Sequence, residues 1–184
     1  MGSISALGPL RVESPEGKRR VGGPRQQAVA AVLLVNRGQP IRTERLIDEV
    51  WGESPPVSVR SSLQSYVSNL RRAFAGLARI DSTSNSYTIL LQPGVFDLDE
   101  LARTIQQAAD LLSEGDLTGA SLRYGQAVAA FGAGTAFDGV DTPSVQQERS
   151  RLDELRMGTG RSGTSPPLIS ATDTVRRHFR LTAR

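Results

Sequence analysis

Hydrophobic and polar residues alternate over three short runs at the start of the chain. The runs cover residues 3–7, 10–13 and 18–21, and they are separated by Gly8-Pro9 and by Pro15-Glu16-Gly17. Short alternating runs bounded by glycine and proline are typical of a small antiparallel sheet. We therefore expect the chain to begin with β-structure.

Apolar residues then recur at helical spacing in two segments. PRQQAVAAVLLV is apolar on most sides and starts with proline after Gly22-Gly23, which predicts a buried helix. Residues 40–42 are expected to be extended, with Thr43 capping a second helix, TERLIDEVWG. Its apolar stripe includes Trp51, which we place in the core; stacking of Trp51 on a DNA base is the weaker alternative.

A third helix, SVRSSLQSYVSNLRRAF, covers residues 58–74 and has two different faces. Its apolar face repeats every three or four residues and consists of Val59, Leu63, Val67, Leu70 and Phe74. At about 100° per residue, the opposite face is made of serines, an asparagine and an arginine. The helix is therefore expected to pack on a core and to present polar groups outward.

A β-hairpin is predicted after this helix, with a polar tip at residues 82–86 and a return strand at 87–91. Sheet, three helices and hairpin in this order resemble a winged helix-turn-helix of the response-regulator (OmpR-like) kind, in which the third helix reads DNA. We expect this domain to cover residues 1–92.

Two further helices with apolar stripes, DLDELARTIQQAADLLSEG and DLTGASLRYGQAVAAF, predict a tetratricopeptide-like hairpin. Leu122, Ala127 and Phe131 are expected to contribute to the stripe of the second. After a loop, a third helix ends near Met157, so a second domain is expected over residues 95–157. Residues 158–184 show no periodicity and are expected to form a disordered or atypical tail.

Charge is distributed unevenly between these parts. Residues 1–92 hold 12 basic and 7 acidic side chains, whereas residues 93–157 hold 5 and 11. A basic first half beside an acidic second half suggests two modules, the first of which faces a polyanion.

The third helix combines the features that DNA recognition requires: a narrow rod, polar groups for base edges, and flanking cations for phosphates. Small hydroxyls allow close approach, and the amide side chains are of the type that reads adenine. The predicted DNA-binding residues are Arg60, Ser61, Ser62, Gln64, Ser65, Ser68, Asn69, Arg71, Arg72, Arg79 and Asn85. The alternative is that these residues form only the solvated face of an amphipathic helix.

Catalysis, cofactors and metals have little support in the sequence. The chain has no cysteine, and its single histidine, His178, lies in the predicted tail, so disulfides, cysteine zinc sites and thiol chemistry are excluded. No glycine-rich phosphate loop follows a strand, and we expect neither enzymatic activity nor a cofactor. No run approaches the roughly 20 apolar residues of a membrane span, and no export signal is evident, so we expect a cytoplasmic protein without a membrane partner.

Several blocks in the same order resemble a known family, the Streptomyces antibiotic regulatory proteins. These join an OmpR-like domain to a bacterial transcriptional activator domain. The blocks are LGPLRV, GGPRQQAVAAVLLVNRGQPI, ERLIDEVWGESPP, SVRSSLQSYVSNLRRAF, FDLDELARTIQQA and TPSVQQERSRLDELR.

The resemblance implies a transcription factor, usually an activator in a secondary-metabolite cluster. Such a protein would bind direct repeats in double-stranded promoter DNA, with copies side by side as in a homodimer, and would contact RNA polymerase. The chain departs from the family at Asn69, where arginine is usual, at Ser86-Tyr87, where Gly-Tyr is usual, and over AFGAGTAF at residues 130–137. The family's activator domain continues beyond the position of Met157, so we expect the helical domain to be incomplete at its C-terminus.

A function of another class is a protein-interaction module, in which residues 95–157 bind partners and DNA binding is weak or lost. An enzyme ranks behind both.

Overall fold

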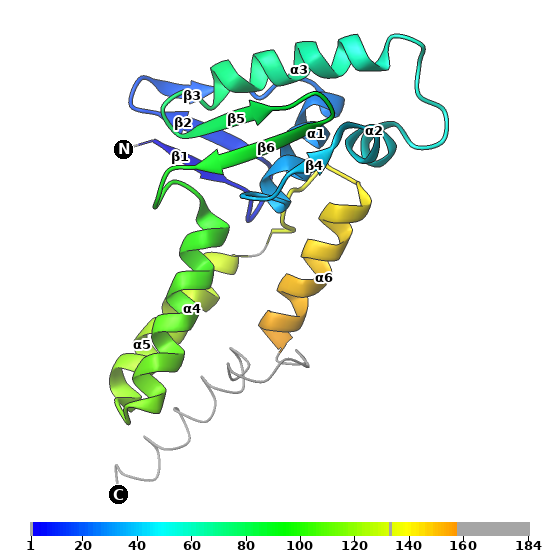
Figure 1. Cartoon of the computed structure of the whole chain (residues 1–184). Helices are drawn as coiled ribbons and strands as arrows, with labels where there is room; N and C mark the ends of the chain where they lie inside the picture. Colours follow the sequence, from blue (N-terminus) through cyan, green and yellow to red (C-terminus); the bar gives the residue numbers. More distant parts are fainter. Residues whose placement is uncertain (1, 133, 158–184) are drawn as a thin grey trace, which may run out of the picture. The chain divides into compact units, whose positions relative to one another are not determined.

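The computed structural model describes residues 2–132 and 134–157, which form two compact units (Figure 1). The first unit comprises the chain up to Asp97 together with Thr135–Glu148. The second comprises the described residues of 98–134 and of 149–157. The predicted tail at residues 158–184, including His178, lies outside the described residues.

The chain begins with a three-stranded antiparallel sheet, as predicted. Strands β1 (Ser3–Ser5), β2 (Arg11–Ser14) and β3 (Gly17–Arg19) lie in that order. Ile4 pairs with Val12. Directly paired residues of neighbouring strands point to the same face of a sheet, and both of these side chains are buried. Gly17 adopts a φ of 125° in the turn between β2 and β3, a conformation that favours glycine.

Three helices follow: α1 (Pro24–Val35), α2 (Thr43–Trp51) and α3 (Val59–Ala73). Helix α1 is the central buried helix expected from its apolar sequence, since every residue from Val29 to Leu34 is buried. The prediction that Thr43 caps α2 is wrong. Thr43 is the first residue of the helix and is itself buried, and Arg42 occupies the cap position without a side-chain hydrogen bond.

The reason lies in a second sheet, whose strands β4 (Ile41–Arg42), β5 (Ala78–Ser82) and β6 (Ser86–Leu91) are arranged in the order β4-β6-β5. The chain passes directly from β4 into α2, and the backbone N–H of Thr43 donates to the carbonyl of Asn85 at 2.7 Å. Pairing with the hairpin therefore extends to Thr43, where the helix begins, and Arg42 rather than Thr43 stands at the cap. Strands β5 and β6 form the predicted hairpin, which is the wing of a winged helix-turn-helix.

Trp51 was predicted in the core but lies at its edge, partly exposed. Its ring stacks on Tyr66 with centroids 6.1 Å apart and planes inclined by 7°, and the guanidinium of Arg25 lies 5.6 Å from the ring centroid. Trp51 is the last residue of both the apolar stripe and α2, and the core ends there. Its neighbours come from α3 and from the start of α1.

A segment distant in sequence completes the first unit. Phe137 is fully buried, and its backbone N–H donates to the carbonyl of Ala6 at 2.7 Å. Asp138 donates similarly to Gly8 at 3.0 Å, and the Asp97 carboxylate accepts the backbone N–H groups of Ala6 and Leu7. Phe137 and Asp138 therefore extend the packing of the N-terminal segment.

The start of α6 (Pro143–Met157) also belongs to this unit. Glu49 of α2 accepts the backbone N–H of Ser144 at 3.1 Å and the Ser144 hydroxyl at 2.5 Å. Arg45 pairs with the same carboxylate. The helix that precedes α3 is thus bonded directly to the first turn of α6.

The second unit contains α4 (Asp97–Ser113) from Leu98 onward, α5 (Leu117–Phe131) and the later part of α6. Asp116 caps α5 by accepting the N–H of Gly119 at 2.9 Å. The buried face of α5 consists of Ala120, Tyr124, Ala127 and Phe131. The prediction for Leu122 is wrong: it is 64% exposed, because it lies two residues before Tyr124 and points to the opposite face.

Within the described residues, no helix has the length and apolar character needed to cross a membrane.

Candidate nucleic-acid interface

Helix α3 is fixed to the core by one face and leaves the other open. Leu63, Val67 and Leu70 are fully or almost fully buried, which orients the helix about its axis. Arg71 and Arg72 occupy its last turn, where cations stabilise the negative end of the helix dipole. The outer face is thereby held rigidly in position.

The predicted DNA-binding residues come to the surface almost without exception. Nine of them are exposed: Arg60, Ser61, Gln64, Ser65, Ser68, Arg71, Arg72, Arg79 and Asn85. Ser62 and Asn69 are partly buried. The predicted residues that belong to α3 lie on one side of the helix and on its two flanks. Arg79 and Asn85 lie on the wing.

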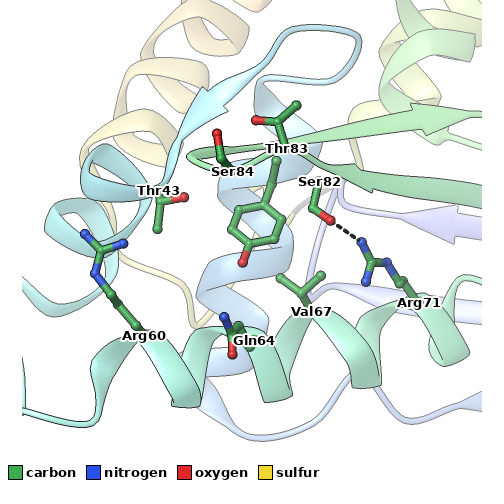
Figure 2. A pocket seen from close by; sticks show the side chains of 9 residues that line it. Thr43, Arg60, Gln64, Val67, Arg71, Ser82, Thr83 and Ser84 are labelled. Atoms are coloured by element: carbon green, nitrogen blue, oxygen red, sulfur yellow. Dashed lines mark hydrogen bonds between the residues drawn. The ribbon is translucent and has the colours of Figure 1, made fainter.

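A groove of about 220 Å³ separates α3 from the wing (Figure 2). From α3 it is lined by Arg60, Gln64, Val67 and Arg71, which follow one another at spacings of four, three and four residues. Ser82, Thr83, Ser84 and Tyr87 of the hairpin, together with Thr43, form the facing wall. The polar groups of this groove can donate and accept hydrogen bonds, and two arginines supply positive charge.

Arg71 connects the helix to the wing. Its Nε donates to the carbonyl oxygen of Ile80 at 2.9 Å, and its terminal nitrogen donates to the Ser82 hydroxyl at 3.1 Å. A planar guanidinium presents several donors in a rigid fork that matches both acceptors, whereas the lysine ammonium lacks this fork. Arg71 was predicted only as a DNA-binding residue, and nothing in the sequence indicated this connection.

Arg60, at the other end of the groove, forms an exposed ion pair with Glu44 of α2 at 2.8 Å. A hydrogen bond from the backbone of Glu44 and the guanidinium of Arg60 hold the pKa of Glu44 below its ordinary value of 4.5. The carboxylate is therefore charged at neutral pH, and the stabilising contribution of this pair is lost only as pH falls through the lowered pKa.

Replacing Glu44 with glutamine is expected to strengthen DNA binding by about two- to fivefold, the size of one exposed ion pair. The substitution removes a negative charge beside the groove and releases Arg60 to pair with a phosphate. Dissociation constants measured at two salt concentrations test this, because the gain should shrink at higher salt. Glu13→Gln, on β2, is the control that should leave affinity unchanged; a weaker Glu44→Gln variant would contradict the expectation.

The wing offers less charge than the helix. Arg79 forms an ion pair with Asp81 at 2.8 Å, so its charge is partly compensated. Thr83 and Ser86 share a hydrogen bond between their hydroxyls at 2.8 Å, which closes the tip around Asn85. The serine at position 86 thus stabilises the turn in this chain.

Asn69 is bonded inward. Its amide nitrogen donates to Oε1 of Gln26 in α1 at 3.3 Å, and its Oδ1 accepts a hydrogen bond from Arg72. Asn69 and Arg72 also line a second hollow with Arg19, the last residue of β3, and Arg20, which follows it. Sequence reasoning did not include these two arginines, although the basic run Lys18-Arg19-Arg20 was a visible signal.

Among the described residues, no group of three or more histidine, cysteine, aspartate or glutamate side chains could hold a metal ion.

Two family models match the chain, one over the winged helix and one over the helical region that follows it. Residues 17–84 match the model described as "Transcriptional regulatory protein, C terminal", and residues 96–164 match the bacterial transcriptional activator domain. The winged helix and the helical region thus each match a family of bacterial regulators.

Several curated proteins are similar to this chain. The regulatory protein AfsR of Streptomyces coelicolor is 32% identical over 155 residues, which is 84% of this chain and 15% of AfsR. The transcriptional regulatory protein EmbR of Mycobacterium tuberculosis is 43% identical over 70 residues, 38% of this chain and 18% of EmbR. The transcriptional regulator RedD of S. coelicolor is 23% identical and is covered over 47% of its length.

A solved structure of M. tuberculosis EmbR, in complex with a low-affinity phosphopeptide, is similar over 83% of this chain and 42% of that chain. The TM-score is 0.75 at 27% sequence identity. This chain therefore spans less than half the length of each of these proteins, and the similarity covers both of its structural units.

Proposed function

We propose that the chain is a transcriptional regulator of the Streptomyces antibiotic regulatory protein family and that it binds specific promoter DNA through α3. Its matches to the two family models and its similarity to AfsR support this proposal. The observation that carries this proposal is the outer face of α3, whose hydroxyl, amide and guanidinium groups are exposed beside the groove next to the wing. The helix would enter the major groove, where base edges present distinct donors and acceptors.

The proposed roles follow from position on the helix. Ser61, Gln64, Ser65 and Ser68 would contact base edges, and Arg60, Arg71 and Arg72 would contact phosphates. The DNA-binding domain covers residues 1–92 and the activator domain residues 95–157. Double-stranded DNA is the polyanion that fits the positive net charge of the first of these domains.

Binding to genomic promoter fragments tests the proposal. The full chain should shift a small subset of fragments at moderate salt and should release them when an unlabelled copy of the same fragment is added. Binding that ignores sequence, or no binding even at low salt, would remove the proposal in favour of a protein-interaction role for residues 95–157.

Gln64→Ala is expected to change base preference more than overall affinity. Gln64 is exposed in the middle of α3, and a bidentate contact of this kind is worth about 1–3 kcal/mol of discrimination. Competition among duplexes with single base changes measures the effect: one position should lose its preference while the salt dependence stays unchanged. Uniform weakening at every position would show that Gln64 does not read a base.

The wider role extends the same proposal. In the cytoplasm, copies of the chain would sit side by side on direct repeats and contact RNA polymerase, activating genes of a secondary-metabolite cluster. Family resemblance and the similarity to AfsR and RedD support this. Transcription from a promoter with both repeats, compared with one repeat deleted, tests it.

A further inference from the structure

The hollow beside β3 concentrates positive charge on the flank of α3 opposite the wing. Arg20 and Arg72 are exposed there, and no acidic residue lines the hollow in the described part of the chain. Arg19, the third arginine, is already engaged: it donates to the carbonyls of Ala73 and Ala75 at 3.3 and 2.6 Å and pairs with Glu16. Arg20 and Arg72 therefore supply the charge that an incoming anion would meet.

Arg72 is held by a chain of hydrogen bonds that starts in the core. Gln26 is 8% exposed and donates from Nε2 to the carbonyl of Val21 at 2.6 Å. Its Oε1 accepts from Asn69, and Asn69 Oδ1 accepts from Arg72. Gly22 makes room for this chain, because a Cβ at that position would lie 2.6 Å from the Gln26 carboxamide carbon.

The position of the hollow favours DNA as its ligand. Ser65, Ser68 and Arg72 follow one another at spacings of three and four residues, so Arg72 continues the face proposed to read bases. Arg60, Gln64 and Arg71 border the wing on one flank of this face, and Asn69 and Arg72 border the N-terminal sheet on the other. A helix in the major groove lies between two phosphate backbones, and cations on both flanks match that geometry.

We propose that Arg20 and Arg72 bind one backbone phosphate of the DNA on the flank of α3 facing the N-terminal sheet, and that Asn69, held by Gln26, positions Arg72 for this contact. The inference rests on the proposed function, since the phosphate belongs to the duplex that α3 reads. It assigns a part of the N-terminal sheet to the interface and gives Asn69 a positioning role.

The test uses the full chain, a promoter duplex selected by the fragment assay, and a scrambled duplex of equal length. Arg20→Ala and Arg72→Ala should each weaken binding to both duplexes by about two- to fivefold, the size of an exposed ion pair. The double variant should lower the slope of log affinity against log salt by about 1, because one phosphate contact is lost. Arg11→Ala, an exposed arginine of the same sheet outside the hollow, is the matched control.

A methylphosphonate scan of the duplex locates the contact. Wild-type binding should weaken when one particular phosphate is neutralised. The Arg20→Ala variant should be less sensitive at that position, and the double variant should be insensitive. Asn69→Ala alone should make binding less sensitive to the neutralisation of this phosphate. When it is combined with Arg72→Ala, it should cause no further loss of sensitivity.

The outcomes separate the two proposals. Absence of sequence-specific binding by the wild-type chain overturns the proposed function. Specific binding by the wild-type chain, with Arg20→Ala behaving as Arg11→Ala, overturns only the phosphate contact. An Asn69→Ala effect that persists in full without Arg72 overturns the positioning role.

Discussion

Replacing Phe137 with alanine is expected to lower the free energy of unfolding of the first unit by about 3–5 kcal/mol, the usual cost of removing a buried phenyl group. Phe137 is fully buried, although it lies some 45 residues after Leu91, the last residue of the wing. Its backbone N–H donates to the carbonyl of Ala6, which follows β1, so the main chain joins residues 135–148 to the N-terminal segment and the buried side chain adds to the core.

Urea denaturation followed by tryptophan fluorescence measures this effect, because Trp51 is the single tryptophan of the chain and lies in the first unit. The urea concentration at the midpoint of unfolding should fall strongly for Phe137→Ala. It should stay nearly constant for Leu122→Ala, because the Leu122 side chain is mostly exposed. Equal midpoints for both variants would mean that the segment contributes nothing to the stability of the DNA-binding unit. For the same reason, a fragment ending at residue 94 should be less stable than the full chain.

Arg71→Ala is expected to weaken DNA binding by about tenfold, more than a single exposed ion pair, because hydrogen bonds from a charged group are lost together with the charge. The two bonds from Arg71 to Ile80 and Ser82 hold the wing against α3. Without them the groove loses its fixed width, and the wing is no longer positioned beside the helix.

Arg71→Lys separates the two contributions. Lysine keeps the charge but lacks the planar fork that makes both directional bonds, so the affinity of Arg71→Lys should lie between those of the wild type and Arg71→Ala. Hydrogen exchange at the amides of residues 82–86 provides an independent measure, since both variants should exchange faster than the wild type in the absence of DNA. If Arg71→Lys keeps the DNA affinity and the amide exchange rates of the wild type, Arg71 contributes only its charge.

The helical parts of the fold could be predicted because their signal is local. In α3, apolar residues at spacings of three and four fix which face is buried, and Leu63, Val67 and Leu70 are buried as expected. The same logic failed at the ends of elements. Thr43 begins its helix inside a sheet hydrogen-bond network, and Trp51 completes an apolar stripe where the core has already ended.

For the candidate interface, the sequence indicated which residues would be exposed and left their partners undetermined. Arg71 and Asn69 lie only two positions apart in α3, but one bonds to the wing and the other to a core glutamine. Arg20 was overlooked because it lies some fifty positions before Arg72, and periodicity carries no information over such a separation.

The sequence by itself determined the order of strands and helices, the two-faced character of α3 and the family blocks, because these depend on residues a few positions apart. Only the tertiary structure decided that residues 135–148 complete the first unit, that Arg71 bonds to the wing, and that Arg20 and Arg72 line the same hollow. These are contacts between distant segments. They depend on how elements pack and on which buried polar groups find partners, and neither is encoded in local spacing.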